Sequence, residues 1–408
     1  MHSRDDEHDH PDPVEQPQHY DWGELDTNKC LTARVFLPFF STQYKTNVTM
    51  RCLLRCLSTS LPIDDDFTST EITPLHLDSP LWKSPPIRKT WDATTFLSLY
   101  HAHFHRAAPL LFHHLRQHIY HLPESAYQSQ FTQPLNPISN LGLSGSLFFL
   151  TQDKSIIIKS LNRSFEYTFL HTAMLDALGH YFLTHESATL IARITDVLYT
   201  FDHRFGAWLG ISPSHYIVME NILTGLDESE EGRCRKWDLK PQNFFEPTRD
   251  LVPDDLKTEQ AKSGLADALD EPIVLTKRDR DDLIAILERD LEFLEQMGTI
   301  DYSLLLGRYP VEMFKGEGGT LEWGGDAAAA DTSGKGRWEE RFVKGVRSGD
   351  GKWVYRMTVL DWLWNVERLR PKVMKTAGKL LPEQTVTTEP GRYRREFMKM
   401  MDEYIKVV

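Results

Sequence analysis

The sequence alternates apolar segments with polar segments that are interrupted by proline. Its first twenty residues are rich in Asp, His, Pro and Gln and contain almost no large aliphatic side chains. Such a segment cannot bury enough apolar surface to offset the entropy lost on ordering, so we predict that residues 1–20 form a disordered tail. Apolar residues return between Thr32 and Leu61, where the spacing around Cys52 and Cys56 predicts a helix.

The rest of the first third is predicted to be mainly helical. Residues 64–86 are polar and rich in proline, which indicates a surface loop. Between Asp92 and Leu122 the large apolar residues recur at helical spacing and predict one or two helices with wide buried faces. We therefore expect residues 21–139 to form a helical N-terminal extension that braces the lobe beginning near residue 140.

The pattern changes at Ser144, where strand-like segments begin. Residues 145–150 and 155–159 are predicted strands and 151–154 a turn, so this part predicts a glycine-led hairpin that ends in Lys159. Further elements complete a small mixed lobe over 140–225, and a charged loop comes after it. In order they are a helix over 165–182, strands over 191–199 and 216–219, and the loop over 226–235.

The last part, 226–408, combines a helix, strands and a long insertion. A leucine stripe from Leu283 to Leu294 predicts a helix that stops at Gly298, and an apolar strand follows over 300–306. Many glycines and little periodicity predict a flexible insertion over 314–351. The remaining predicted elements are a strand over 354–360 and an amphipathic terminal helix over 393–408.

Composition narrows the class of protein. The 408 residues suffice for about two to three domains, and 40% of them are hydrophobic, as in soluble globular proteins. A net charge of −13 argues against a protein that wraps nucleic acid. The sequence has no apolar run long enough for a membrane-spanning helix, a polar start and only four cysteines without a CxxC pair. We therefore expect a cytoplasmic chain in which thiol chemistry is not central.

Lys159 is the first candidate for chemistry. It follows three isoleucines, and a lysine on so apolar a strand needs an anionic partner to stay charged. Two interpretations remain open, a lysine that extends into water at a sheet edge and a lysine that binds phosphate. The turn over 142–146 favours phosphate, because a glycine turn lets backbone amides approach phosphate oxygens closely. The sequence contains no Walker A motif, which excludes a P-loop site.

Two carboxylates lie at predicted strand ends. Asp301 stands at the start of a very apolar strand, where it suits a base, a metal ligand or a turn residue after Gly298. Asp361 ends another strand, and period-two alternation puts it on the apolar face of Met357 and Val359. A carboxylate there requires a cation, and Mg²⁺ and a nearby arginine remain open as alternatives.

Two further patterns have competing interpretations. The run from Asp238 to Asn243 matches part of the protein-kinase catalytic loop, but the usual preceding His and Arg are absent, and neither Asp-Phe-Gly nor Ala-Pro-Glu follows. The pairs His101/His105 and His114/His118 have the helical spacing at which two histidines can face one metal. The acidic residue of a zinc-protease motif is missing, so surface histidines are favoured.

Taken together in order, five motifs resemble the core of the phosphatidylinositol phosphate kinase family, over roughly residues 140–408. They are Ser144-Gly145-Ser146 with Lys159, Met219-Glu220-Asn221, Asp238-Leu239-Lys240, the run from Ile300 to Gly307, and Val359-Leu360-Asp361. The resemblance implies an α+β, two-lobed, SAICAR synthase-like fold with antiparallel sheets and flanking helices, and with the nucleotide in the cleft between the lobes. The closing segment and the Met-Glu-Asn triplet are similar to the branch that phosphorylates phosphatidylinositol 3-phosphate at the 5-position.

The resemblance also implies roles for individual residues, with ATP and Mg²⁺ as cofactors. Lys159 and the turn Ser144, Gly145 and Ser146 would contact the nucleotide phosphates, with Glu166 as a candidate ion-pair partner of the lysine. Met219, Glu220 and Asn221 would lie next to adenine. Asp301 would face the inositol hydroxyl, Asp361 would bind Mg²⁺, and Lys240 would be a further phosphate contact. Asp238 belongs to the same Asp-Leu-Lys motif, which we assign to the catalytic set.

The sequence departs from the family at two places. Pro241-Gln242 stands where the family usually has Gly-Ser, and Leu143 occupies a place in the turn where the family has a small or basic residue. A pseudokinase that binds phosphoinositide membranes as a scaffold is therefore an alternative to an active lipid kinase.

The segment after Asp361 corresponds to the family's activation loop, which selects the lipid and meets the bilayer. It comes after Trp362 and Trp364 and carries five basic residues, namely Arg368, Arg370, Lys372, Lys375 and Lys379. Basic residues attract anionic headgroups and aromatic residues favour the membrane interface, although a solvated basic loop is the alternative. We expect a peripheral membrane protein whose partners are ATP and a phosphatidylinositol monophosphate in an anionic membrane, without nucleic acid and with homodimerisation left open.

Overall fold

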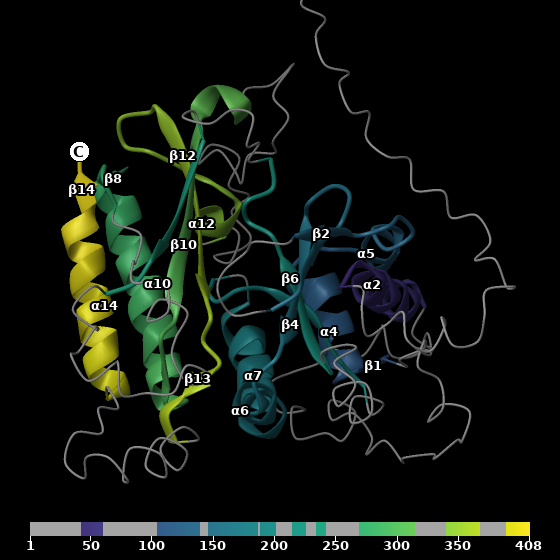
Figure 1. Ribbon diagram of the computed structural model, residues 1–408. Helices are drawn as coiled ribbons and strands as arrows, with labels where there is room; N and C mark the ends of the chain where they lie inside the picture. The colour runs from purple at the N-terminus through teal and green to yellow at the C-terminus, as the bar shows by residue number, and fades with distance from the viewer. Residues whose placement is uncertain are drawn as a thin grey trace, which may run out of the picture.

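The computed structural model describes nine segments of the chain, and their elements gather around two main β-sheets (Figure 1). The described residues are 42–59, 104–138, 146–186, 188–200, 214–225, 234–241, 269–314, 340–367 and 389–408. Helices lie beside both sheets, so the predicted α+β class is confirmed. Within the described residues, none of the helices has the length and apolar character needed to cross a bilayer.

The first sheet has six antiparallel strands in the order β1-β5-β6-β4-β3-β2. The strands are β1 (Phe104–Arg106), β2 (Asn136–Ile138), β3 (Phe148–Leu150), β4 (Ile156–Leu161), β5 (Ile194–Thr200) and β6 (His215–Glu220). The hairpin β3–β4 was predicted and is confirmed, but β4 continues past Lys159 to Leu161. Lys159 therefore lies within the strand, opposite Ile217 of β6.

Alternate side chains of this sheet enter two different cores. Ile217 and Val197 face a core that includes the helices α4 (Pro109–His114), α6 (Ser164–Phe169) and α7 (Leu175–His185), with the π-helical turns η3 (Leu115–Ile119) and η4 (Leu170–Met174). Neighbouring positions such as Val218 and Leu198 enter the second core with α2 (Thr42–Ser58) and α5 (Glu124–Ser129). Both faces are covered, as period-two alternation with apolar residues on each side requires.

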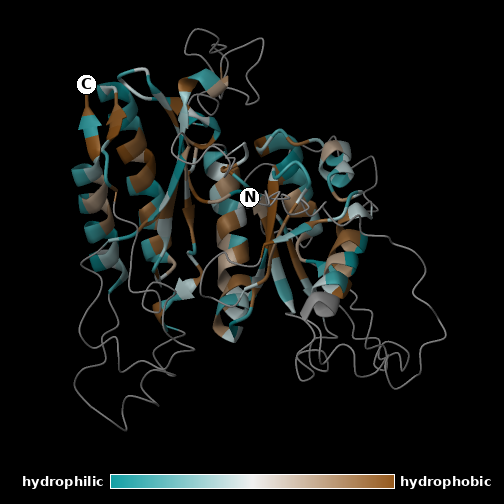
Figure 2. Ribbon diagram, turned by 45° about the horizontal axis from the view of Figure 1, so that its top comes forward, coloured by the Kyte–Doolittle hydropathy of each residue, from teal (hydrophilic) through white to brown (hydrophobic). Residues whose placement is uncertain are grey.

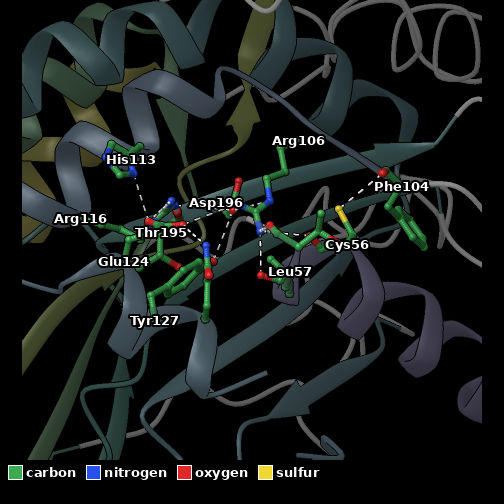
Figure 3. Close-up of polar contacts among 12 residues, drawn as sticks. Cys56, Leu57, Phe104, Arg106, His113, Arg116, Glu124, Tyr127, Thr195 and Asp196 are labelled. Carbon is green, nitrogen blue, oxygen red and sulfur yellow. Dashed lines mark hydrogen bonds and ion pairs between the residues drawn. The ribbon is translucent and has the colours of Figure 1, made fainter. Parts of the chain in front are cut away.

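A buried ionic cluster fastens α2 to this sheet (Figure 3). The guanidinium of Arg106 donates to the carbonyl oxygens of Cys56 and Leu57, at 3.0 and 2.7 Å, and so binds the free carbonyls at the end of α2. Its Nε lies 3.4 Å from Asp196 Oδ2, and Arg116 Nη1 lies 3.6 Å from the same oxygen. Asp196 and Arg116 are fully buried, so their charges stay inside only because they are paired.

The second sheet has four antiparallel strands in the order β11-β12-β10-β7. They are β7 (Arg235–Leu239), β10 (Ser303–Pro310), β11 (Val346–Arg347) and β12 (Trp353–Leu360). The long helices α10 (Lys277–Gln296) and α14 (Pro390–Tyr404) run side by side next to this sheet (Figure 1). Figure 2 shows hydrophobic residues concentrated on the strands and on the helix surfaces that lie against them.

Two short sheets and two short helices complete the part of the structure that is built around the four-stranded sheet. They are β8 (Ile273–Leu275) with β14 (Ile405–Val407), β9 (Thr299–Ile300) with β13 (Trp364–Asn365), the 3-10 turn η8 (Val311–Phe314) and α12 (Arg341–Lys344). Thr276 begins α10 by accepting a hydrogen bond from the amide of Asp279, and Gly298 ends this region with a φ of 67°. The predicted helix and its stop are confirmed.

The segment 188–192 joins the two main sheets. Its residues Leu190 and Ala192 exchange backbone hydrogen bonds with Val359 of β12, at 2.6 and 3.1 Å, and the chain then enters β5 of the other sheet. From α10, the buried carboxylate of Asp290 accepts hydrogen bonds from the Leu190 amide and the Tyr181 hydroxyl. One continuous apolar core includes residues of both sheets.

Several sequence expectations need correction. Residues 104–106 form β1 rather than part of a helix, because they pair with β5 at the sheet edge. The predicted strand over 300–306 is two strands, β9 and β10, separated by Asp301 and Tyr302. The terminal helix ends at Tyr404, because residues 405–407 pair with β8 as β14. The predicted insertion contains α12 and β11 in its last residues, while 315–339 lie outside the described residues.

The predicted domain limits can be compared with the sheets. Strands β1 and β2 precede residue 140 and belong to the six-stranded sheet, so the predicted boundary at 139 runs through that sheet. The tail 1–20, the loop 64–86 and most of the charged loop over 226–235 lie outside the described residues. The division into two lobes stays a prediction.

Candidate active site

Lys159 and Asp361 meet between the two sheets. Lys159 is on β4 and its Nζ lies 2.6 Å from Oδ1 of Asp361, which follows β12. The same ammonium lies 5.6 Å from the centre of the Phe148 ring on the neighbouring strand. The two side chains are 19% and 34% exposed, so a ligand can reach both. The anionic partner that we expected for Lys159 is therefore Asp361 in this structure.

Asp361 does not continue the alternation of β12. Its φ is 61°, in the left-handed region that non-glycine residues seldom adopt. The turn takes the carboxylate away from the buried positions of Met357 and Val359 and leaves it half-exposed beside Lys159. The predicted placement on the apolar face of β12 is therefore wrong, because the strand ends at Leu360.

Asp301 has the same unusual backbone conformation, with a φ of 64°. It lies in the break between β9 and β10, and the residue is only 5% exposed. Its Oδ1 is 3.3 Å from Nζ of Lys240. Left-handed backbone at non-glycine residues costs on the order of 1–3 kcal/mol and is concentrated at functional sites, so two such aspartates in one cluster support a functional role.

Strand β7 carries Asp238, and Lys240 directly follows the strand. Leu239 pairs with Leu304 of β10, which places Lys240, the next residue, beside the break that holds Asp301. Lys240 is 3% exposed, and a buried ammonium at that depth requires carboxylate partners. Asp238, on the same strand, adds a third carboxylate to the electrostatics of the cluster. The cluster of Lys159, Lys240, Asp238, Asp301 and Asp361 is called the carboxylate–lysine cluster below.

The cluster gives its carboxylates different affinities for protons. Burial raises the pKa of Asp301 to about 6, and the nearby charge of Lys240 opposes that rise. Desolvation would also raise the pKa of Asp361, but the charges of Lys159 and Lys240 outweigh it and lower that pKa to about 2. Burial lowers the pKa of Lys240, but Asp301 and Asp361 outweigh it and keep the net shift upward. One carboxylate can exchange a proton near neutral pH, and the other stays ionised.

Helix α14 closes one side of the cluster with an aromatic residue that the sequence did not single out as a site residue. The hydroxyl of Tyr393 donates to the carbonyl oxygen of Tyr302 at 2.6 Å, and the two rings meet edge to face, 4.7 Å apart. Burial raises the pKa of Tyr393 far above its usual value, and the carboxylate of Asp301 raises it further. The contact holds the residue after Asp301 in place. The sequence did contain a hint of this role, because Tyr393 lies in the C-terminal segment whose sequence is similar to the phosphatidylinositol phosphate kinase family.

Other predicted site residues lie at or near this region with different partners. Glu166 pairs with Arg163 at 3.1 Å, and the charge of Lys159 also stabilises its ionised form. Glu220 is held by Arg193 and Lys344. Asn221 binds the β3–β4 turn, donating to the carbonyl oxygen of Lys154 at 2.8 Å. The side chains of Glu220 and Asn221 therefore bind other parts of the chain in this structure and are not directed at a ligand.

Some predicted residues cannot be placed. Of the glycine turn, Ser146 is described at the start of β3, whereas Ser144 and Gly145 lie outside the described residues, as does Gln242. The five basic residues Arg368, Arg370, Lys372, Lys375 and Lys379 also lie outside them. Trp362 and Trp364 are described and are buried, at 4% and 6% exposure. The prediction that they favour a membrane interface is wrong, because they pack in the core, with Trp364 against Phe165.

The potential metal ligands of the described residues do not form a multidentate cluster. Within the part of the chain that the structure describes, no group of three or more His, Cys, Asp or Glu residues has the geometry of a metal site. His105 is on β1, and the rings of His114 and His118 lie 4.5 Å apart at a tilt of 34°. Mg²⁺ is commonly bound by one or two carboxylates plus substrate phosphates, and the half-exposed carboxylate of Asp361 fits that chemistry.

Comparisons with known proteins place most of the described elements in one family profile. The profile of the family described as Phosphatidylinositol-4-phosphate 5-Kinase matches residues 129–404. Phosphatidylinositol 4-phosphate 5-kinase type-1 sktl of Drosophila melanogaster is 25% identical over 236 residues, which cover 57% of this chain and 28% of the relative. Phosphatidylinositol 4-phosphate 5-kinase its3 of Schizosaccharomyces pombe is 27% identical over 238 residues, which cover 53% of this chain and 28% of the relative.

A plant relative gives the highest identity of the three. Phosphatidylinositol 4-phosphate 5-kinase 7 of Arabidopsis thaliana is 31% identical over 202 residues, which cover 49% of this chain and 24% of the relative. The matched part therefore spans about a quarter of the length of these relatives.

Proposed function

Since this chain belongs to the phosphatidylinositol-4-phosphate 5-kinase family, we propose that it transfers the γ-phosphate of ATP to an inositol hydroxyl of a phosphatidylinositol monophosphate. The observation that carries the proposal is the carboxylate–lysine cluster. Lys159 lies 2.6 Å from Asp361, 202 residues away in sequence, and Lys240 lies 3.3 Å from Asp301, 61 residues away. Phosphoryl transfer needs mainly positioned cations, a metal carboxylate and a carboxylate that orients the hydroxyl.

The two sheets would act as two lobes with the nucleotide bound between them. Lys159 belongs to the six-stranded sheet, and Asp361 and Asp301 adjoin the four-stranded sheet, so a nucleotide between the sheets would touch both. The segment Met219–Asn221 at the end of β6 would lie along the adenine. Mg²⁺ would be held by Asp361, where it would neutralise charge that develops on the transferred phosphoryl group.

The chain's own residues would divide the work of the transfer. Lys159, released from Asp361 when nucleotide binds, would hold the nucleotide phosphates. The inositol oxygen would form a bond to the γ-phosphorus as the bond from that phosphorus to the β–γ bridging oxygen breaks and ADP leaves. The hydroxyl proton would pass to Asp301, whose pKa of about 6 suits a group that accepts a proton near neutral pH. Lys240 would stabilise negative charge on the equatorial oxygens.

The lipid would be met at a membrane surface. The segment 365–408 holds ten Lys or Arg against six Asp or Glu in a chain whose overall charge is −13. Arg368, Arg370, Lys372, Lys375 and Lys379 would attract the anionic headgroups, at about 1 kcal/mol each near the surface. The relatives named above are phosphatidylinositol 4-phosphate 5-kinases, and the similarity to the 3-phosphate 5-kinase branch stays a prediction, so both monophosphates are candidate substrates.

The test is a direct assay with variants of the cluster. Purified protein is incubated with ATP, Mg²⁺ and vesicles that contain each phosphatidylinositol monophosphate in turn, and bisphosphate product is measured. We expect product with at least one lipid, and a loss of at least 100-fold in Asp361→Asn and Lys159→Met. The matched control is Asp402→Asn, since Asp402 pairs with Arg280 on the exposed surface of α10 and α14, outside the cluster.

The outcomes separate the proposal from its alternatives. Folded protein that gives no product with any lipid rejects the kinase function, and vesicle binding without a nucleotide effect then indicates a scaffold. Phosphorylation of a protein substrate that is lost in Asp238→Asn and retained in Asp301→Asn would support the protein-kinase interpretation of the run from Asp238 to Asn243 instead.

A further inference from the structure

A second segment between the two sheets, distinct from 188–192, is held by charged residues outside the carboxylate–lysine cluster. This segment, residues 219–224, includes the end of β6 and is called the linking segment below. Glu220 lies in it and forms ion pairs in two directions, at 3.3 Å with Nη1 of Arg193 and at 2.8 Å with Nζ of Lys344. Arg193 precedes β5 in the six-stranded sheet, and Lys344 ends α12, which packs on β12 of the four-stranded sheet.

Arg193 is the buried member of the network around Glu220, whose own side chain is 26% exposed. The side chain of Arg193 is only 1% exposed and also pairs with Glu340, at 2.9 Å, just before α12. Burial alone would raise the pKa of Glu220, but the charges of Arg193 and Lys344 outweigh it and lower the pKa to about 2. Glu220 is therefore ionised at any physiological pH, and each sheet supplies a cation to the same carboxylate.

The four-stranded sheet also binds the backbone of the linking segment. Arg356 of β12 donates from Nη1 to the carbonyl oxygen of Thr224 at 3.1 Å and from Nε to that of Lys344 at 3.0 Å. Tyr309 of β10 donates its hydroxyl to the carbonyl oxygen of Ile222 at 3.2 Å. Gly345, at a φ of 140°, ends α12 where an added Cβ would approach Val354 to 2.9 Å. These contacts fix α12, the linking segment and β12 to one another.

The linking segment is connected by short paths to both halves of the cluster. Glu220 pairs with Ile156 across β6 and β4, three residues before Lys159. Arg356 lies five residues before Asp361 on β12. A rotation of one sheet against the other would change the approach of Lys159 to Asp361, and it would have to break the ion pairs of Glu220.

We infer that Glu220 is a positioning residue that joins the two sheets and sets the approach of Lys159 to Asp361. The part of this inference that concerns nucleotide rests on the proposed function. The resemblance implied that Glu220 lies next to the adenine, whereas its carboxylate is occupied by Arg193 and Lys344. It acts through the orientation of the linking segment, and the adenine would meet the backbone of that segment.

Hydrogen–deuterium exchange of the apo full-length chain tests the joining role without reference to activity. The variants are Glu220→Gln, Lys344→Met and their combination, with the surface variant Asp402→Asn as control. We expect amides of residues 215–224 and 156–161 to exchange at least fivefold faster in both single variants. The double variant should equal Glu220→Gln, because both changes break the same connection, and the control should match the wild type.

Steady-state kinetics test the positioning role. We expect Glu220→Gln to raise KM for ATP at least fivefold and to leave KM for the lipid within twofold, because the proposed lipid contacts are Asp301 and the basic residues after Asp361 rather than the linking segment. Unchanged exchange in Glu220→Gln overturns the inference, and so does faster exchange with an unchanged KM for ATP. If the wild type phosphorylates no lipid, the proposed function fails, while the exchange measurement still decides whether Glu220 joins the sheets. Lys344, with a side chain 38% exposed, offers a mild variant if Glu220→Gln does not fold.

Discussion

At the scale of single residues, the cluster separates two aspartates by their surroundings. Asp361 is half-exposed and lies 2.6 Å from a lysine, whereas Asp301 is buried and lies 3.3 Å from one. Burial favours the neutral form of both carboxyl groups. The charges of Lys159 and Lys240 outweigh it at Asp361 and lower that pKa to about 2, whereas Lys240 offsets it only in part at Asp301, whose pKa is raised to about 6. The residue with the higher pKa is the better proton acceptor, so roles can be assigned from environment.

The pH dependence of the proposed transfer should report Asp301. A carboxylate must be ionised to accept a proton, so kcat/KM for the lipid should rise with pH through about 6. In Lys240→Met the remaining activity should rise at a higher pH, because the lost cation had lowered the pKa of Asp301. Lys240→Arg, which keeps the charge, should keep the rising limb close to pH 6. A limb that does not move in Lys240→Met would show that another group controls the profile.

The structure brings together several residues that the sequence singled out, but the sequence did not predict how they meet. Lys159, Asp301 and Asp361 could be singled out from the sequence because each stands at one end of an apolar run, where a charged side chain requires an explanation. Their partners were not readable, since the pairing of Lys159 with Asp361 depends on how the two sheets pack. The resemblance implied Glu166 as a candidate partner of Lys159, and Glu166 forms its ion pair with Arg163 instead.

At the scale of secondary structure elements, α2 is held mainly by one arginine and an apolar face. Arg106 donates three hydrogen bonds to carbonyl oxygens at the end of α2, and Leu53 and Leu57 are fully buried in the core beneath it. The family profile begins at residue 129, yet α2 and β1 cover and extend the six-stranded sheet. We therefore expect the family domain of this chain to need residues before 129 for its stability.

Replacement of Arg106 tests that expectation. Arg106→Met should lower the free energy of unfolding by about 3 kcal/mol, because it leaves Asp196 buried with Arg116 as its remaining cation. Arg280→Met, which removes exposed ion pairs with Asp281 and Asp402, should cost less than about 1 kcal/mol. Urea unfolding at pH 7 measures both. Equal losses in the two variants would show that the buried cluster does not stabilise α2.

The buried carboxyl group of Asp290 on helix α10 allows a second test of how buried charge affects stability. Asp290 is fully buried, and burial raises its pKa to about 6, while Tyr181 and the amide of Leu190 donate to its oxygens. A carboxyl whose pKa is raised on folding stabilises the fold most when protonated, and that stability is lost as pH rises through the folded pKa. The wild type should therefore lose stability as the pH rises from about 4 to above 6.

Asp290→Asn removes this titration. Relative to the variant, the wild-type free energy of unfolding should fall by about 2 kcal/mol between pH 4.5 and pH 7.5, at 1.36 kcal/mol per unit of pKa difference. Urea unfolding at the two pH values checks the difference, in which other titrating groups cancel. A difference that is constant with pH would mean that Asp290 is already ionised in the folded protein at pH 4.5.

Most elements could be predicted from periodicity, and the exceptions share a cause. The helix over 277–296 and the strands β3, β4, β6 and β12 follow from local apolar spacing. The strands β1 and β14 were assigned to helices, because their short runs form strands only through pairing with β5 and β8. Trp362 and Trp364 looked like interfacial residues beside a basic segment, and only the packing of β13 against α6 shows that they are buried.

At the scale of the whole molecule, an uneven charge distribution reconciles a net charge of −13 with the proposed anionic lipid substrate. Ten basic residues against six acidic ones fall within 365–408, so the acidic excess belongs to the rest of the chain. An acidic body and a basic segment would orient the protein, because a negative membrane surface attracts one and repels the other. Binding should then weaken steeply with salt, since charges beyond about 8 Å are screened at physiological ionic strength.

Neutralising the basic segment tests this orientation. The variant replaces by glutamine the five residues Arg368, Arg370, Lys372, Lys375 and Lys379. Its control carries the same change in charge at exposed positions outside 365–408, namely Arg55, Lys154, Lys236, Lys277 and Lys352. Cosedimentation with vesicles that contain phosphatidylserine should show at least a tenfold loss of affinity in the variant, since each basic residue contributes about 1 kcal/mol near the surface. The control should lose less than threefold. Equal losses in both would mean that total charge, rather than this segment, brings the protein to the membrane.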